Sequence, residues 1–148
     1  MKLTNVNLSE FDTGYNEGTN SNANLVDDAL SSLGFMAISR QMINDNLLRD
    51  IFNVSKDFFA LSNEEKMKSA YLSAGENFGF HAIASEHLDP TKPADLKETF
   101  TMRNILNNDV DHHRWPSPEF KNLMQRFFSE CLDKAHQLQR VLAKALHI

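Results

Sequence analysis

The chain has 148 residues, which suffices for one domain built around a single hydrophobic core. Hydrophobic residues make up 41% and charged residues 24% of the chain, as in ordinary globular proteins. The formal net charge of −5 argues against a general affinity for nucleic acid or for anionic membrane surfaces, since both favour basic proteins.

No apolar run approaches the length of about 20 residues that a membrane-spanning helix needs. Residues 1–12 lack the apolar core of a secretory signal. The single cysteine, Cys131, excludes an internal disulfide and a multi-cysteine zinc site. We therefore expect a cytoplasmic, soluble protein with neither nucleic acid nor membrane as a partner.

The first quarter of the chain predicts two strands and one helix. Residues 1–11 contain a short alternating pattern that is compatible with a half-buried strand. Residues 12–24 are rich in Gly, Asn, Thr and Ser and predict a loop. Apolar residues at helical spacing over 25–33 predict a helix, and Gly34 follows where helices commonly end. The apolar run 35–38 predicts a buried strand.

Two helices are expected next, the first beginning at a cap formed by Asn44 or Asp45. Its core-facing side is predicted to carry Leu47, Leu48, Ile51, Phe52, Phe58 and Phe59. Ser62 and Glu65 have the spacing of a capping box, in which each side chain bonds the backbone N–H of the other residue. The second, short helix is therefore predicted over 63–71.

The second half predicts one strand and one long helix. Residues 74–93 contain glycines and prolines without a sustained period and predict an irregular loop. Residues 98–102 alternate and predict a strand. Residues 104–118 are polar and turn-rich, with Trp115 as their bulky anchor. The whole pattern indicates an α+β fold that is predominantly helical, with three main helices, one short helix and two or three short strands.

The last segment, 118–147, predicts a long helix with a proline at its first position. Its apolar residues recur at steps of three and four: Phe120, Leu123, Met124, Phe127, Phe128, Cys131, Leu132, Ala135, Leu138, Val141, Leu142, Ala145 and Leu146. Such a stripe could also pack against another chain. One hypothesis for this protein is therefore a standalone interaction module that associates with itself through the 118–147 helix.

A second hypothesis comes from a family resemblance that covers residues 6–148. The matching segments are Leu33-Gly34-Phe35, 43–52, Lys56-Asp-Phe-Phe-Ala-Leu-Ser62, Glu64-Glu65-Lys66, Gly79-Phe80, Asp95-Leu-Lys-Glu-Thr-Phe100, Trp115-Pro116 and the final helix. Together they resemble the amino-terminal domain of the isopenicillin N synthase-like iron(II)/2-oxoglutarate-dependent dioxygenases. Where that family often has Asn-His-Gly, this chain has Arg40-Gln41-Met42.

The resemblance implies that residues 1–148 form a single non-haem dioxygenase N-terminal domain, and that its strands join the sheet of a jelly-roll domain. In the family, that jelly roll carries a His-x-Asp pair and a distal His that hold iron beside 2-oxoglutarate. We expect the catalytic jelly roll to be absent from this chain. It would then bind neither Fe²⁺ nor 2-oxoglutarate alone, carry no catalytic residue, and be inactive without the jelly roll or a separate chain that supplies one.

A His-x-Asp pair does occur, at His87 and Asp89, with His136 and His147 further along. We interpret it as a coincidence. Pro90 follows the pair directly in a predicted loop, and both distal histidines lie on one predicted helix, whereas a facial triad needs facing strands of a barrel. A divergent metalloprotein that uses these groups is the third hypothesis.

Four residues near the predicted loop and second strand are candidates to face a substrate, because the resemblance places them toward the substrate entrance: Phe80, His81, Thr101 and Arg103. Arg103 could meet a substrate carboxylate, although a surface ion pair is the more ordinary role. The adjacent His112 and His113 are expected to be solvated. Cys131 lies within the apolar stripe and is expected to be unreactive, because burial raises a thiol pKa.

Overall fold

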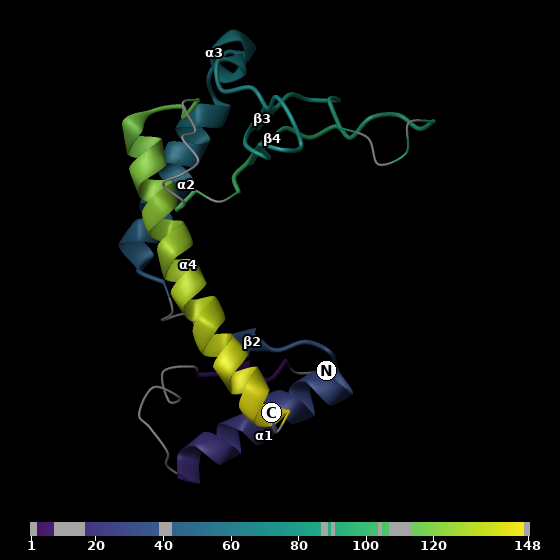
Figure 1. Ribbon diagram of the computed structural model, residues 1–148, viewed down its shortest axis with the longest axis vertical. Helices are drawn as coiled ribbons and strands as arrows, with labels where there is room; N and C mark the ends of the chain where they lie inside the picture. Colours follow the sequence, from purple (N-terminus) through teal and green to yellow (C-terminus); the bar gives the residue numbers. More distant parts are fainter. Residues whose placement is uncertain are drawn as a thin grey trace. The chain divides into compact units, whose positions relative to one another are not determined.

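The structure is a computed structural model that describes residues 3–7, 17–38, 43–86, 89, 91–103, 105–106 and 114–146 (Figure 1). The chain divides into two compact units. Unit 1 comprises Met1–Asn44 and Ser129–Ile148, and unit 2 comprises Asp45–Phe128. The described residues form four helices and four short strands. About half of the described residues are helical, so an α+β fold with three longer helices and one short helix is confirmed, whereas the predicted two or three strands are four.

Unit 1 begins with strand β1 (Asn5–Val6), which pairs in parallel with β2 (Ala37–Ile38). A hydrogen bond from the Ala37 N–H to the Thr4 carbonyl, at 2.8 Å, ties the two strands together. A strand within residues 1–11 is therefore confirmed. The prediction of a buried strand over 35–38 is wrong in part, since the strand has two residues and Phe35 is 71% exposed.

Helix α1 (Glu17–Ser32) begins earlier than the sequence pattern indicated. The prediction of a loop over 12–24 is wrong for its second part, while residues 12–16 lie outside the described residues. Ala23, Val26 and Ala29 are all buried, so the helical stripe starts with a small residue that a search for large apolar side chains passes over. The helix end was predicted correctly.

At that end Gly34 adopts a positive φ of 72°, and its N–H bonds the Leu30 carbonyl at 3.0 Å. Leu33 bonds Ala29 in the same way, also at 3.0 Å. This left-handed residue satisfies carbonyls of the last helical turn, as the sequence predicted. The chain can then turn directly into β2.

Unit 2 begins with helix α2 (Asp45–Phe59), whose apolar face buries Leu47 and Phe58. The predicted face is correct in part, but the placement of Phe52 on it is wrong, because Phe52 is 73% exposed. An apolar residue at helical spacing can still lie at the edge of the stripe, where no neighbouring element covers it. Figure 1 shows α2 beside the first turns of helix α4 (Pro118–Ala145), where Phe58 meets Phe120 at a ring distance of 5.6 Å.

Helix α3 (Asn63–Met67) is capped as predicted, with the Glu65 N–H donating to Ser62 Oγ at 3.2 Å. The helix ends four residues before the predicted position 71. Residues 69–71 instead run beside β3, and the Tyr71 N–H bonds the Phe80 carbonyl at 2.9 Å. Pairing with a distant strand therefore overrides the local helical preference.

Strand β3 (Gly79–His81) pairs antiparallel with β4 (Thr99–Thr101). Strand β4 confirms the predicted strand over 98–102, whereas β3 lies inside the stretch predicted to be an irregular loop. Gly79 has a φ of 125°, and a Cβ there would lie 2.7 Å from backbone atoms of Ala70 and Tyr71. Only glycine fits where these two backbones cross.

Helix α4 confirms the long helix predicted from residue 118. The Phe120 N–H donates to Ser117 Oγ at 3.0 Å, which caps the helix start. Its residues 118–128 belong to unit 2 and its residues 129–145 to unit 1. No described helix is long and apolar enough to cross a membrane.

Each unit has its own core. The core of unit 2 is mainly aromatic and consists of Phe58, Phe78, Phe80, Ile105, Phe120 and Met124. Its rings meet edge to face, as between Phe58 and Phe80 at a centroid distance of 5.7 Å, and Trp115 packs on Phe78 at 4.8 Å. The described core of unit 1 consists of Val6, Val26 and Val141, with partly buried aliphatic residues around them.

Candidate functional site

Polar side chains gather in unit 2 where β3, β4 and the connection between them meet. The Glu86 carboxylate lies 3.5 Å from His81 Nδ1 and 3.5 Å from Lys97 Nζ, and it accepts a hydrogen bond from Thr99 Oγ1 at 3.4 Å. We call His81, Glu86, Lys97 and Thr99 the Glu86 cluster. It contains an acceptor and three potential donors, one on each strand and one just before β4.

The surroundings hold these groups in place. The ring of His81 lies against the ring of Tyr71, with a centroid distance of 4.0 Å and an interplanar angle of 35°. Lys97 Nζ also lies 3.2 Å from the Asp95 carboxylate. The hydrogen bond to Asp95, and then the charge of Glu86, raise the pKa of Lys97, which keeps the amine cationic. The Asp95 N–H bonds the Glu86 carbonyl at 2.9 Å, which closes the connection between the strands.

A buried ion pair supports the other side of the hairpin. Lys66 on α3 is only 7% exposed, and its Nζ lies 2.6 Å from Glu98, just before β4. The same ammonium donates to the Phe59 carbonyl at 3.4 Å and lies 5.3 Å from the centroid of the Phe80 ring. This pair joins α3 to β4 through the core, and its role is structural.

A second ion pair, between Arg114 and Glu76, holds the loop before β3 in place. Arg114 forms a two-pronged hydrogen bond with the Glu76 carboxylate, at 3.1 and 2.8 Å. Its Nε donates to the Ala70 carbonyl at 3.1 Å. A planar guanidinium suits such a paired contact, so Arg114 holds the segment before Trp115 to the loop that leads into β3.

The four residues predicted to face a substrate occupy different environments. Phe80 is 2% exposed and its ring lies in the core of unit 2. His81 is part of the Glu86 cluster, Thr101 is half-buried opposite Gly79 in the strand pair, and Arg103 is exposed. Contact of these residues with a substrate stays a prediction.

Sequence reasoning singled out His81 but missed its partners. Glu86, Lys97 and Thr99 lie 5 to 18 positions further along the chain, and the hairpin register brings them to His81. The only local signal was the segment 95–100, which belongs to the family resemblance and contains two of these residues.

Comparison with known proteins decides the family. Residues 5–129 match the family described as the non-haem dioxygenase in morphine synthesis N-terminal domain. This is most of the chain. The chain belongs to this family.

Relatives of this dioxygenase N-terminal domain include homoarginine-6-hydroxylase 2-ODD-C23 of Glycine max, which is 28% identical over 132 residues. The naringenin,2-oxoglutarate 3-dioxygenase of Arabidopsis thaliana is 28% identical over 121 residues. The matches cover 82% and 80% of this chain but only 39% and 33% of the relatives. The chain therefore spans well under half the length of these proteins.

A solved structure shares the fold. It is that of a full-length Neurospora crassa protein in complex with alpha-KG, and it matches with a TM-score of 0.79 and 21% identity. The match covers 99% of this chain and 47% of that one. This similarity supports the fold of the dioxygenase N-terminal domain.

The described residues do not fit a ferrous iron site. Among them, no three side chains of His, Cys, Asp or Glu are grouped so that they could hold a metal ion. Asp89 is exposed and its Oδ1 accepts hydrogen bonds from the Thr91 backbone at 2.9 Å and hydroxyl at 2.8 Å, which lower the Asp89 pKa. His87, His112, His113 and His147 lie outside the described residues.

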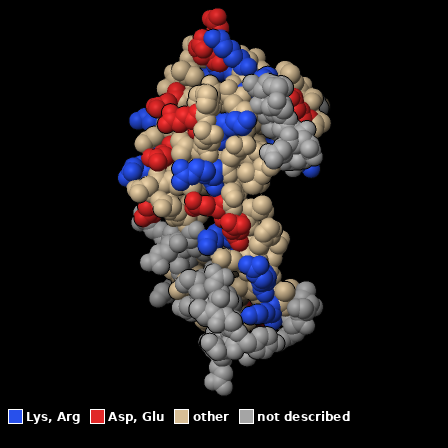
Figure 2. Space-filling model, turned by 60° about the vertical axis from the view of Figure 1, so that its left-hand side comes forward, with Lys and Arg blue, Asp and Glu red and all other residues tan. Residues whose placement is uncertain are grey.

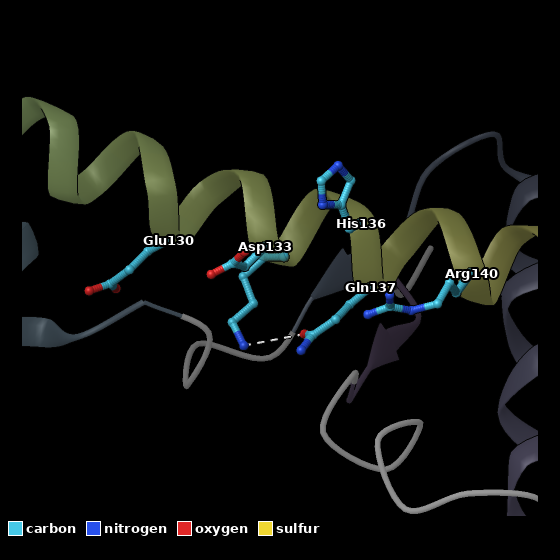
Figure 3. Close-up of a pocket in the computed structure, with 6 residues that line it drawn as sticks. Glu130, Asp133, His136, Gln137 and Arg140 are labelled. Atoms are coloured by element: carbon cyan, nitrogen blue, oxygen red, sulfur yellow. Dashed lines mark hydrogen bonds between the residues drawn. The ribbon is translucent and has the colours of Figure 1, made fainter. Parts of the chain in front are cut away.

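Unit 1 of the domain has an open hollow of about 520 Å³ along α4. Its described lining consists of Glu130, Asp133, Lys134, His136, Gln137 and Arg140 (Figure 3). All six lie on one helix, and Figure 3 shows His136 projecting to the other side of the helix from Gln137. A hydrogen bond from Lys134 to Gln137, at 3.2 Å, is the only one drawn between them. These polar residues do not converge on a ligand position.

Charge elsewhere on the domain is mixed. Figure 2 shows Lys and Arg side chains interspersed with Asp and Glu on the visible face, rather than gathered in a patch of one sign. A hollow of about 190 Å³ in unit 2 is lined by Asp50, Asp57 and Glu119, together with three uncharged residues. These carboxylates do not form a metal-binding group. Of the arrangements described, the Glu86 cluster has the most convergent chemistry.

Proposed function

We propose that these residues form the amino-terminal domain of an iron- and 2-oxoglutarate-dependent oxidoreductase that oxidises a small molecule. Iron and 2-oxoglutarate would be held by a jelly-roll domain outside residues 1–148, either on the same polypeptide or on a separate chain. The observation that carries the proposal is the family match over residues 5–129. The named relatives are 2-oxoglutarate oxygenases, and their length leaves room for a second domain of at least equal size.

We further propose that β1 and β2 join the sheet of that jelly roll. A parallel pair of two-residue strands has too few hydrogen bonds to be stable alone, and parallel sheets are normally covered on both faces. Phe35 and Ile38, beside and within β2, have exposed side chains. A neighbouring strand and its side chains would cover both the open edge and these apolar groups.

The domain alone is proposed to be inactive. Ferrous iron in such enzymes needs two imidazoles and a carboxylate on one face, and the described residues offer no such group. Unit 2 would then support the catalytic domain, and the β3–β4 hairpin would contribute groups toward its substrate.

Two measurements test the proposal. The purified 148-residue chain, given ferrous iron, ascorbate and 2-oxoglutarate, should form no succinate above a protein-free control. Adding the jelly-roll domain encoded downstream, as a fusion or in trans, should produce iron-dependent succinate formation. Turnover by the chain alone that disappears in His87→Ala would contradict the proposal. A downstream reading frame without a His-x-Asp pair would contradict the version in which the jelly roll is on the same polypeptide, and only a separate chain could then supply it.

A separate measurement is needed to show which partner the chain binds. The jelly roll is the proposed partner, while self-association through the 118–147 helix is the competing possibility, since Phe128 and Leu132 on α4 are partly exposed. Sedimentation of the chain at micromolar concentration, with and without the jelly roll, separates them. A monomer that forms a one-to-one complex supports the proposal, whereas a stable homodimer that ignores the jelly roll contradicts it.

A further inference from the structure

The Glu86 cluster presents three donors to a single carboxylate. His81 Nδ1, Lys97 Nζ and Thr99 Oγ1 surround Glu86, one group on each strand of the hairpin and one beside it. A planar carboxylate accepts about four hydrogen bonds through its two oxygens, so one carboxylate can satisfy all three donors. The His81 ring is held in position against Tyr71.

Glu86 fits these donors loosely, in contrast to three other glutamates of unit 2. Glu65, Glu76 and Glu98 approach their cationic partners to 2.6, 2.8 and 2.6 Å. Each contact of Glu86 measures 3.4 or 3.5 Å. Charge-assisted hydrogen bonds ordinarily measure about 2.7–2.9 Å, so Glu86 bridges its donors without a close bond to any of them.

We propose that His81, Lys97 and Thr99 form a binding site for the carboxylate of a small organic acid, and that Glu86 occupies this site when no ligand is bound. Glu86 and Lys97 both belong to the connection between the two strands, whereas His81 and Thr99 are fixed by the antiparallel register. Lys97 lies two residues before Thr99, and its ammonium is held 3.2 Å from Asp95. The donors would therefore stay in place while Glu86 yields to a ligand that can approach all three more closely. Lys97 supplies the positive charge that attracts the carboxylate, and His81 and Thr99 orient it through hydrogen bonds.

This inference rests on residues of the domain itself and does not require the proposed catalytic partner. An internal carboxylate competes with an external one, and the apparent dissociation constant rises in inverse proportion to the fraction of open sites. If Glu86 fills about nine-tenths of the sites, its removal should strengthen carboxylate binding on the order of tenfold. The substitution of choice is Glu86→Ala, because a glutamine would keep a carbonyl acceptor.

The experiment titrates the 148-residue chain with sodium acetate at fixed pH and ionic strength, and follows the ring signals of His81 by NMR. In Glu86→Ala the signals should shift saturably, at an acetate concentration on the order of tenfold below that of the unsubstituted chain. Acetamide, a neutral molecule of the same shape, should produce no saturable shift. The exposed Glu64→Ala variant is the matched control and should behave like the unsubstituted chain.

A second variant separates binding from a purely structural ion cluster. Lys97→Gln combined with Glu86→Ala should remove saturable acetate binding while the amide spectrum stays dispersed. The proposal is overturned if folded Glu86→Ala shows no saturable shift, if acetamide acts as acetate does, or if the double variant binds acetate unchanged.

Discussion

The two units of the domain are stabilised by different kinds of core. Unit 2 buries several aromatic rings in edge contact and adds the Lys66–Glu98 ion pair beneath its hairpin. The described core of unit 1 has three valines and a parallel strand pair with two residues in each strand. An aromatic side chain buries about 150–250 Å², considerably more than a valine. Unit 2 thus has the means to hold its own fold. The described core of unit 1 contains no aromatic ring, and we expect unit 1 to gain more from additional burial, such as the proposed jelly roll would supply.

The strongest test of this comparison removes a ring from unit 2. Phe78→Ala should lower the free energy of unfolding by about 3–5 kcal/mol, because Phe78 is fully buried against Phe100 and Trp115. Urea titrations followed by far-UV circular dichroism would measure the loss. Phe52→Ala on α2 is the control and should change stability by less than about 0.5 kcal/mol. Equal losses for the two variants would show that the aromatic core does not govern unit 2.

A slightly smaller effect is expected where backbones cross in unit 2. Gly79→Ala should cost about 3 kcal/mol, since the new Cβ would meet backbone atoms at 2.7 Å and the residue has a φ of 125°. Gly75→Ala is the matched control, because its Cβ would meet only Ser73 Oγ, at 4.0 Å. The same urea titration applies. A Gly79→Ala variant as stable as Gly75→Ala would contradict the close approach of the Gly79 backbone to Ala70 and Tyr71.

The core of unit 1 should respond more weakly and separately. Val141→Ala should cost about 1–2 kcal/mol, because it removes two buried methyl groups from an aliphatic core. Trp115 is the chain's only tryptophan and lies in unit 2, so its fluorescence should report an unchanged midpoint in this variant. A tryptophan midpoint that moves together with the helical signal would show that the units unfold as one body.

The smallest effect concerns the thiol of unit 1. Burial, and then the charge of Glu130, raise the pKa of Cys131, so less thiolate is present near neutral pH than in the unfolded chain. Alkylation by iodoacetamide at pH 8 should be about three- to tenfold slower than in urea, and its rate should rise at higher pH than for the unfolded thiol. Equal rates would indicate that this part of α4 opens readily.

The helix ends and starts that the sequence predicts correctly are determined by residues close to them in the chain. The Ser62 side chain caps α3 by accepting a hydrogen bond from the N–H of Glu65, three residues later. Gly34 ends α1 two residues after the last helical residue, and Pro118 begins α4, whose apolar residues recur at a regular period. Each signal depends on residues within a few turns of the chain. Such patterns are therefore readable without knowledge of the fold.

The elements and contacts that were missed depend on partners far along the chain. Strand β3 is a three-residue strand with Thr99–Thr101 on one side and an isolated bridge between Phe80 and Ala70 on the other. Nothing in Gly-Phe-His itself predicts a strand. The Glu86 cluster was missed for the same reason, because its members meet only through this register. Exposed Phe35 and Phe52 show the converse, since apolar character alone does not supply a covering neighbour.

Lys66 and Lys68 lie two residues apart, but their amino groups differ in how easily a reagent in solution can reach them. The Lys68 side chain is 66% exposed, whereas that of Lys66 is 9% exposed and is held by Glu98. An acylating reagent can therefore reach Lys68 in the native protein but reaches Lys66 only when α3 leaves the hairpin. Acylation there would cancel the ammonium charge and leave Glu98 without its cation, so the native position of the modified segment would be destabilised.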